Sequence, residues 1–96
     1  MVNRNLITIA IGVILSGVAT AANCGNGFYY CGTSLLNKGN YYGDIVNSLT
    51  EAGEPNAETN INQSLFYCKG AHDIPFVKFC EGGCHDAGSG KSDSCN

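Results

Sequence analysis

The apolar positions of this chain form one long N-terminal run and several short runs separated by polar, glycine-containing stretches. The long run extends from Leu6 to Ala22, follows Arg4 and ends on small residues. A charged start, an apolar middle and a small-residue exit are typical of a secretory signal peptide. A retained membrane anchor is disfavoured, because the run is shorter than the roughly 20 residues that span a bilayer. We predict that residues 1–22 are a cleaved signal peptide and that residues 23–96 form one secreted, extracellular domain.

The clearest helical pattern covers residues 41–52. Its apolar residues recur at intervals of three and four positions, which places them on one stripe of a helix: Tyr42, Ile45, Val46 and Leu49. Asn40 suits the N-cap, Asp44 lies in the first turn, Gly53 suits the position after the last turn, and Pro55 prevents continuation. The polar stretch that follows, residues 54–63, has no apolar period and is expected to be a surface loop.

Three short runs are rich in aromatic and β-branched residues: 27–32, 64–68 and 74–80. The first is expected to be a strand carrying Cys31, and the other two a hairpin across the turn at residues 69–73. Pro75 then belongs at a strand start or on an edge. A competing interpretation makes residues 74–81 a short helix that begins after Asp73 and ends at Gly82, and the hairpin is favoured over it. The expected fold is a small disulfide-rich α+β domain, with one helix packed on a short antiparallel sheet.

Six cysteines all lie beyond the predicted cleavage site: Cys24, Cys31, Cys68, Cys80, Cys84 and Cys95. An even number of cysteines in an exported chain predicts three disulfides. A zinc site is disfavoured, because the chain has no C-x-x-C pair and its two histidines complete no ligand pattern. Six cysteines allow 15 pairings, but hairpin geometry disfavours a bond between Cys68 and Cys80. In the glycine-rich tail, residues 81–96, only Cys84 and Cys95 are expected to fix the path of the chain.

Charge excludes two classes of partner. Without Arg4 the chain has four lysines against eight acidic residues, a formal charge of 4 − 8 = −4, and no arginine. Nucleic acids and anionic membranes both need clustered Lys and Arg, so neither is expected to bind. We also expect no membrane span in the mature chain, no metal and no cofactor, and a monomer.

The candidates for catalysis are two histidines with nearby acids and serines: His72, His85, Asp73, Asp86, Asp93, Ser89, Ser92 and Ser94. A triad of His85, Asp86 and a serine is conceivable, but a glycine-rich tail offers little support to hold one. The GSGKSD segment lacks the frame of a phosphate-binding loop. We therefore predict no catalytic residues.

Two surface features remain. Asn62-Gln63-Ser64 is the one N-x-[ST] sequon of the mature chain, and Asn62 is a possible N-glycosylation site in a eukaryotic secretory route. The chain is also rich in aromatic residues, most of which are expected to cover the core, while one or two at the surface could form a recognition patch: Tyr29, Tyr30, Tyr41, Tyr42 and Phe66.

The segments CGTSLLNKGNYYGDIVNSL, NQSLFYC and IPFVKFCEGGCHDAGSGKSDSC together resemble small secreted cysteine-rich proteins of filamentous fungi, a group that contains many effector candidates. The resemblance covers nearly all of the mature chain and implies a secreted protein that faces a host or a competitor. It carries over no catalytic or ligand residue. The leading hypothesis is a non-enzymatic effector that binds a host or competitor protein. The alternatives are a killer-toxin-like or antimicrobial protein, which the acidic charge disfavours, and a small secreted hydrolase or hydrolase inhibitor.

Overall fold

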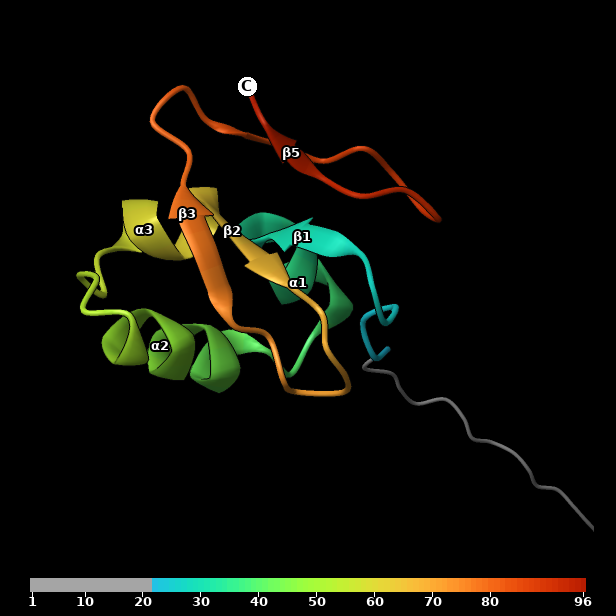
Figure 1. The fold of residues 1–96 in the computed structure, drawn as a ribbon, viewed down its shortest axis with the longest axis horizontal. Helices are drawn as coiled ribbons and strands as arrows, with labels where there is room; N and C mark the ends of the chain where they lie inside the picture. The colour runs from blue at the N-terminus through green and yellow to red at the C-terminus, as the bar shows by residue number, and fades with distance from the viewer. Residues whose placement is uncertain (1–21) are drawn as a thin grey trace, which may run out of the picture.

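The structure is a computed structural model that describes residues 22–96, so the predicted signal peptide lies almost entirely outside the described residues. Three consecutive helices follow the first strand along the chain, and four short strands follow the helices (Figure 1). The elements in chain order are β1 (Tyr29–Cys31), α1 (Gly32–Lys38), α2 (Tyr42–Glu51), α3 (Glu58–Gln63), β2 (Ser64–Tyr67), β3 (Phe76–Phe79), β4 (Cys84–His85) and β5 (Ser94–Cys95). With its three disulfides, this arrangement confirms the predicted small disulfide-rich α+β fold. None of the helices in residues 22–96 is long and apolar enough to cross a bilayer.

The main sheet has the strand order β1-β2-β3 and is antiparallel throughout. Tyr30 pairs with Phe66, and Phe66 pairs with Phe76 across a bulge in the hairpin. The hairpin turns at residues 70–73, where the Asp73 amide donates to the Gly70 carbonyl. The predicted strand and hairpin are therefore confirmed, and the competing helix over residues 74–81 is wrong. Pro75 precedes edge strand β3, as expected, and its carbonyl accepts from the Tyr67 amide.

The hydrophobic core lies between the sheet and the three helices. Helix α2 supplies Ile45 and Leu49, one turn apart, and Tyr41 extends this row from the position before the helix; all three are buried. Leu35 from α1, Ile61 from α3 and Phe66 from β2 complete the centre of the core. At the far end of α2, the Glu54 amide donates to the Leu49 carbonyl and Gly53 has a φ of 76°, which confirms the predicted helix stop.

Two details at the start of α2 differ from the prediction. The N-cap is Tyr41, not Asn40, and Asn40 instead adopts a left-handed φ of 67° directly after Gly39, whose φ is 87°. A short polar side chain tolerates this conformation, so Asn40 serves the turn between α1 and α2. Tyr42 does not belong to the buried stripe, because 60% of it is exposed while Tyr41 is 1% exposed. The core therefore contains Tyr41, whereas the periodicity predicted Tyr42 there.

The segment predicted as a surface loop, residues 54–63, contains helix α3, so this prediction is wrong for residues 58–63. The helix has only one buried apolar residue, Ile61, and a single apolar position has no detectable period. A six-residue helix is not stable by itself and depends on tertiary packing. Helix α3 obtains this packing from α1, α2 and β2. Residues 33–38 likewise belong to a helix that the sequence did not predict, since β1 continues directly into α1.

The glycine-rich tail passes from the end of β3 to the β1 side of the sheet (Figure 1). Its two short strands, β4 and β5, pair with each other. Disulfides Cys31–Cys84 and Cys80–Cys95 hold the tail, as the sequence predicted. The prediction that only cysteines fix its path is wrong, because Asp93 attaches it as well. Asp93 is 4% exposed, and its carboxylate accepts the backbone amides of Cys31 at 2.9 Å and Ala87 at 2.8 Å. The Asp93 amide also donates to the Tyr29 carbonyl. The tail therefore covers the outer edge of β1.

Replacing Asp93 with asparagine is expected to lower the free energy of unfolding by about 2 kcal/mol. An amide group has one acceptor oxygen, so its NH2 group would face either the Cys31 or the Ala87 amide, donor against donor. Urea denaturation of the oxidised variant measures the change, with Asp86→Asn as the control because Asp86 is exposed. Equal stability of the two variants would contradict a structural role for the Asp93 carboxylate.

Candidate functional site

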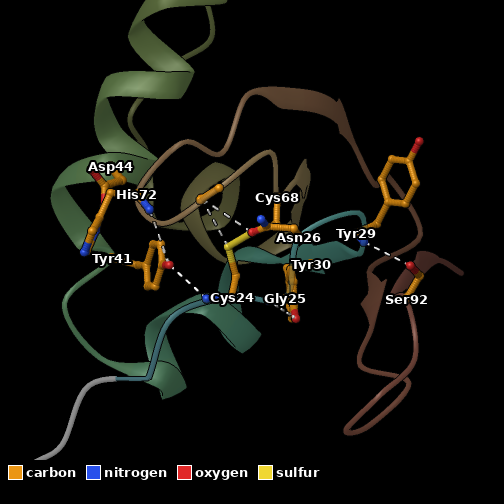
Figure 2. The surroundings of a disulfide bond; sticks show 11 residues. Cys24, Gly25, Asn26, Tyr29, Tyr30, Tyr41, Asp44, Cys68, His72 and Ser92 are labelled. Atoms are coloured by element: carbon orange, nitrogen blue, oxygen red, sulfur yellow. Dashed lines mark hydrogen bonds and ion pairs between the residues drawn. A yellow bond between two sulfur atoms is a disulfide. The ribbon is translucent and has the colours of Figure 1, made fainter.

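The N-terminal end of the described chain is fastened to the hairpin and to the start of α2 (Figure 2). Cys24 forms a disulfide with Cys68 at the end of β2. The Cys24 amide donates to the Tyr41 hydroxyl at 3.0 Å, and the His72 amide lies 3.5 Å from the same oxygen. The buried hydroxyl of Tyr41 thus connects three segments of the chain, which explains why this tyrosine rather than Tyr42 enters the core.

The best-defined pair of polar side chains joins the hairpin turn to α2. His72 Nδ1 lies 2.6 Å from Asp44 Oδ2, and the His72 ring stacks on Tyr41 with centroids 4.9 Å apart. His72 has a φ of 62°, a strained conformation for a residue with a side chain, and these two contacts hold it there. The pair is partly exposed and lies in a hollow of about 530 Å³ whose described lining contains no serine or cysteine. This pair therefore has no adjacent nucleophile of the kind that a catalytic triad requires.

The remaining candidates from the sequence do not assemble around a histidine. Asp93 is buried on backbone amides, and Asp86 accepts the Gly88 amide. Ser92 Oγ accepts the Tyr29 amide at 3.0 Å. His85 and Ser94 face each other in the β4–β5 ladder, but no hydrogen bond joins their side chains within residues 22–96. Asp73 and Ser89 are exposed.

The most prominent surface feature surrounds Tyr42, the most exposed large apolar side chain of residues 22–96. Two hollows flank it, and both include Tyr42 and Leu36. The first, the hollow of the His72–Asp44 pair, also contains Asn40, Tyr41 and Gly43. The second measures about 320 Å³ and is bounded by α3 and the loop before it, through Asn56, Glu58, Ile61 and Asn62. We call the residues of these two hollows the Tyr42 surface.

The charge of the Tyr42 surface is acidic. Asp44 borders the first hollow and Glu58 the second, and none of the four lysines of the sequence lines either one. The lysine of the neighbouring helix, Lys38, instead lies over the ring of Tyr30 at 5.2 Å. A partly apolar centre with acidic edges complements a segment that carries apolar and positively charged side chains.

The predicted aromatic residues divide between core and surface. Tyr41 and Phe66 are buried and Tyr30 is partly buried against the core, whereas Tyr29 and Tyr42 are exposed. Tyr29 packs on Tyr67 with centroids 5.0 Å apart, but no aromatic pair in the described part of the chain includes Tyr42. Tyr42 therefore has more free surface to offer a partner. Sequence periodicity did not predict this exposure, since it placed Tyr42 on the buried stripe.

Asn62, the predicted glycosylation site, occupies the second hollow at the end of α3 and is partly exposed. Glycosylation of Asn62 stays a prediction. All six cysteines are paired, so no thiol is free to bind a metal or to act as a nucleophile.

Comparison of the chain with protein-family models, with curated proteins and with solved structures finds no match.

Proposed function

We propose that the mature chain is a secreted, effector-like protein that acts without catalysis by binding a protein of a host or competitor through the Tyr42 surface. The observation that carries this proposal is the position of Tyr42, which is 60% exposed between two hollows. Tyrosine is enriched at the energetic centres of protein interfaces, because one rigid side chain supplies both apolar area and a hydroxyl. Three disulfides support a role outside the cell, where thiols are oxidised.

The proposed partner segment is basic. Asp44 lines one of the two hollows that include Tyr42, and Glu58 lines the other. The formal charge of −4 for residues 23–96 attracts positive segments from a distance. Because both acids lie near the surface, this attraction is screened by salt.

Replacing Tyr42 with alanine is expected to weaken binding of a basic peptide by about 30-fold, the effect of losing a hot-spot tyrosine. The peptide is obtained by selection from a random display library on the oxidised protein, and its affinity is measured by calorimetry at two salt concentrations. The selected sequences are expected to be rich in Lys, Arg and apolar residues, and their affinity to fall as salt rises. Thermal unfolding should be nearly unchanged, because Tyr42 is largely outside the core.

The matched control is Tyr29→Ala, which removes an exposed tyrosine on the sheet, outside the Tyr42 surface. Equal loss of binding in both variants would contradict the proposed surface. Cleavage of the selected peptides by the wild-type protein would contradict a non-enzymatic role. Killing of yeasts or bacteria that persists in the Tyr42 variant would favour the toxin-like alternative.

A further inference from the structure

Two residues in the described part of the chain, Ser34 and Ser64, have a buried side-chain hydroxyl without a hydrogen-bond partner, and Ser64 is the second residue after Asn62. Ser64 is the first residue of β2 and is 0% exposed, yet its Oγ has no hydrogen-bond partner among the described residues. A buried hydroxyl without a partner destabilises a fold, so each case calls for an explanation. Alanine would occupy the same position without this cost. Ser64 is also the hydroxyl residue that completes the sequon Asn62-Gln63-Ser64.

We propose that Asn62 is an N-glycosylation site that is filled before the chain folds, and that the glycan then covers the α3 side of the Tyr42 surface. The glycosylation itself does not depend on the proposed function. Its consequence for binding, that a partner reaches Tyr42 from the first hollow only, rests on that function.

The order of events follows from the burial of the sequon. In the folded protein the Ser64 side chain is fully covered. The intervening residue is held as well: Gln63 Oε1 accepts the Cys84 amide at 2.8 Å, and the Gln63 carbonyl accepts the Cys80 amide at 3.0 Å. A transferase that must contact the serine hydroxyl can therefore reach it only before β2, β3 and the tail have come together.

The transfer uses a lipid-diphosphate-linked oligosaccharide as donor. The side-chain nitrogen of Asn62 forms a bond to C1 of the first sugar, and the bond between C1 and the diphosphate oxygen breaks. The lipid diphosphate leaves with the bonding electron pair, and the amide proton passes to a base of the transferase. Oxidation and reduction play no part, and the product is an N-linked glycan on a secreted chain.

The location of Asn62 gives the glycan its effect. Asn62 and Tyr42 line the same hollow, together with Leu36, Glu58 and Ile61. An oligosaccharide attached to Asn62 is large compared with a hollow of about 320 Å³ and would lie over it. The first hollow, with His72 and Asp44, does not include Asn62 and should stay open.

The first test is the intact mass of the full chain secreted from a yeast host, before and after treatment with peptide N-glycosidase. The wild type is expected to lose one glycan, and Asn62→Gln and Ser64→Ala to carry none. Ser34→Ala is the matched control, because Ser34 Oγ is also buried without a partner but belongs to no sequon. This variant should keep the glycan, and a wild-type protein without one would overturn the proposal.

A second measurement examines whether the fold uses the Ser64 hydroxyl. The melting temperatures of Ser64→Ala and Asn62→Gln, both without glycan, are expected to agree within about 2 °C. A markedly lower melting temperature for Ser64→Ala would show that the hydroxyl stabilises the fold. The burial of this hydroxyl would then no longer support the proposal.

Two further experiments test the order of events and the covering. Purified oligosaccharyltransferase with a lipid-linked donor should modify the reduced, alkylated chain and leave the oxidised protein unmodified; equal transfer would contradict glycosylation before folding.

Tetranitromethane should nitrate Tyr42 several-fold more slowly in the glycosylated protein than in Asn62→Gln. Tyr29, also exposed but outside this hollow, should react equally in both proteins. Equal nitration of Tyr42 would contradict the covering while leaving the proposed binding surface untouched.

Discussion

Replacing Cys31 and Cys84 together with alanine is expected to lower the free energy of unfolding by about 3.5 kcal/mol. The bond links residues 53 positions apart. With Cys24–Cys68 still closed, the loop that is released in the unfolded chain has 7 + 16 = 23 residues, from Cys24 to Cys31 and from Cys68 to Cys84. A domain of this size is stabilised by only about 5 kcal/mol in total, so the variant should be only marginally folded. It should also lose the attachment of the tail to β1, because Cys31 belongs to β1 and Cys84 to β4.

The matched control is the double replacement of Cys80 and Cys95, which are 15 positions apart. Its expected cost is about 3 kcal/mol, because the closed loop is shorter. Urea denaturation followed by circular dichroism, with the other two disulfides intact, measures both values. The free energy of unfolding could instead fall less for the Cys31 and Cys84 variant than for the Cys80 and Cys95 variant. That result would show that loop length does not determine how much each disulfide stabilises the protein. It would also show that Asp93 and the β4–β5 ladder hold the tail without Cys31–Cys84.

Replacing Gly32 with alanine is expected to destabilise the protein by at least about 3 kcal/mol. Gly32 begins α1 at its contact with α3, and a Cβ atom there would lie 1.6 Å from the Ile61 carbonyl oxygen and 2.8 Å from its carbon. Both are backbone atoms, so no side-chain rotation relieves the overlap. The two helices would have to separate, which would expose the buried side chain of Ile61.

Gly43→Ala is the control for this change, since Gly43 lies in α2 and a Cβ atom there meets nothing within 4 Å. It is expected to raise the free energy of unfolding by about 0.5–1 kcal/mol, because alanine favours the helix. Denaturant unfolding of the two variants, made and oxidised in the same way, gives the comparison. If Gly32→Ala were as stable as the wild type, the close approach of α1 and α3 would not exist in solution.

The parts of the fold that sequence analysis predicted are those with a strong local signal. Helix α2 has several apolar residues at helical spacing and a glycine stop, and the hairpin has two β-rich runs around a short turn. Helix α3 lacked such a signal, because six residues with one buried apolar side chain show no period. Its existence depends on tertiary contact with α1, α2 and β2, which a pattern within six residues does not record.

The candidate site was less predictable than the fold. Periodicity placed Tyr42 on the buried stripe, but the hydrogen bonds that the Tyr41 hydroxyl accepts from the Cys24 and His72 amides favour Tyr41 in the core. Those partners lie 17 and 31 positions away in the chain. No local pattern records such contacts, so the exposed tyrosine and the hollows beside it emerge only in three dimensions.

By itself the sequence determined the α+β class, helix α2, the hairpin and the use of six cysteines in disulfides, because these follow from local periodicity, turn residues and cysteine number. It also disfavoured a bond between Cys68 and Cys80, since Cys68 follows β2 at the turn of the hairpin and Cys80 follows β3 at the other end. Only the tertiary structure decided the pairing itself, the burial of Asp93 under the tail and the exposure of Tyr42. Each of these depends on which distant segments pack together, and packing of that kind has no signature within a short stretch of sequence.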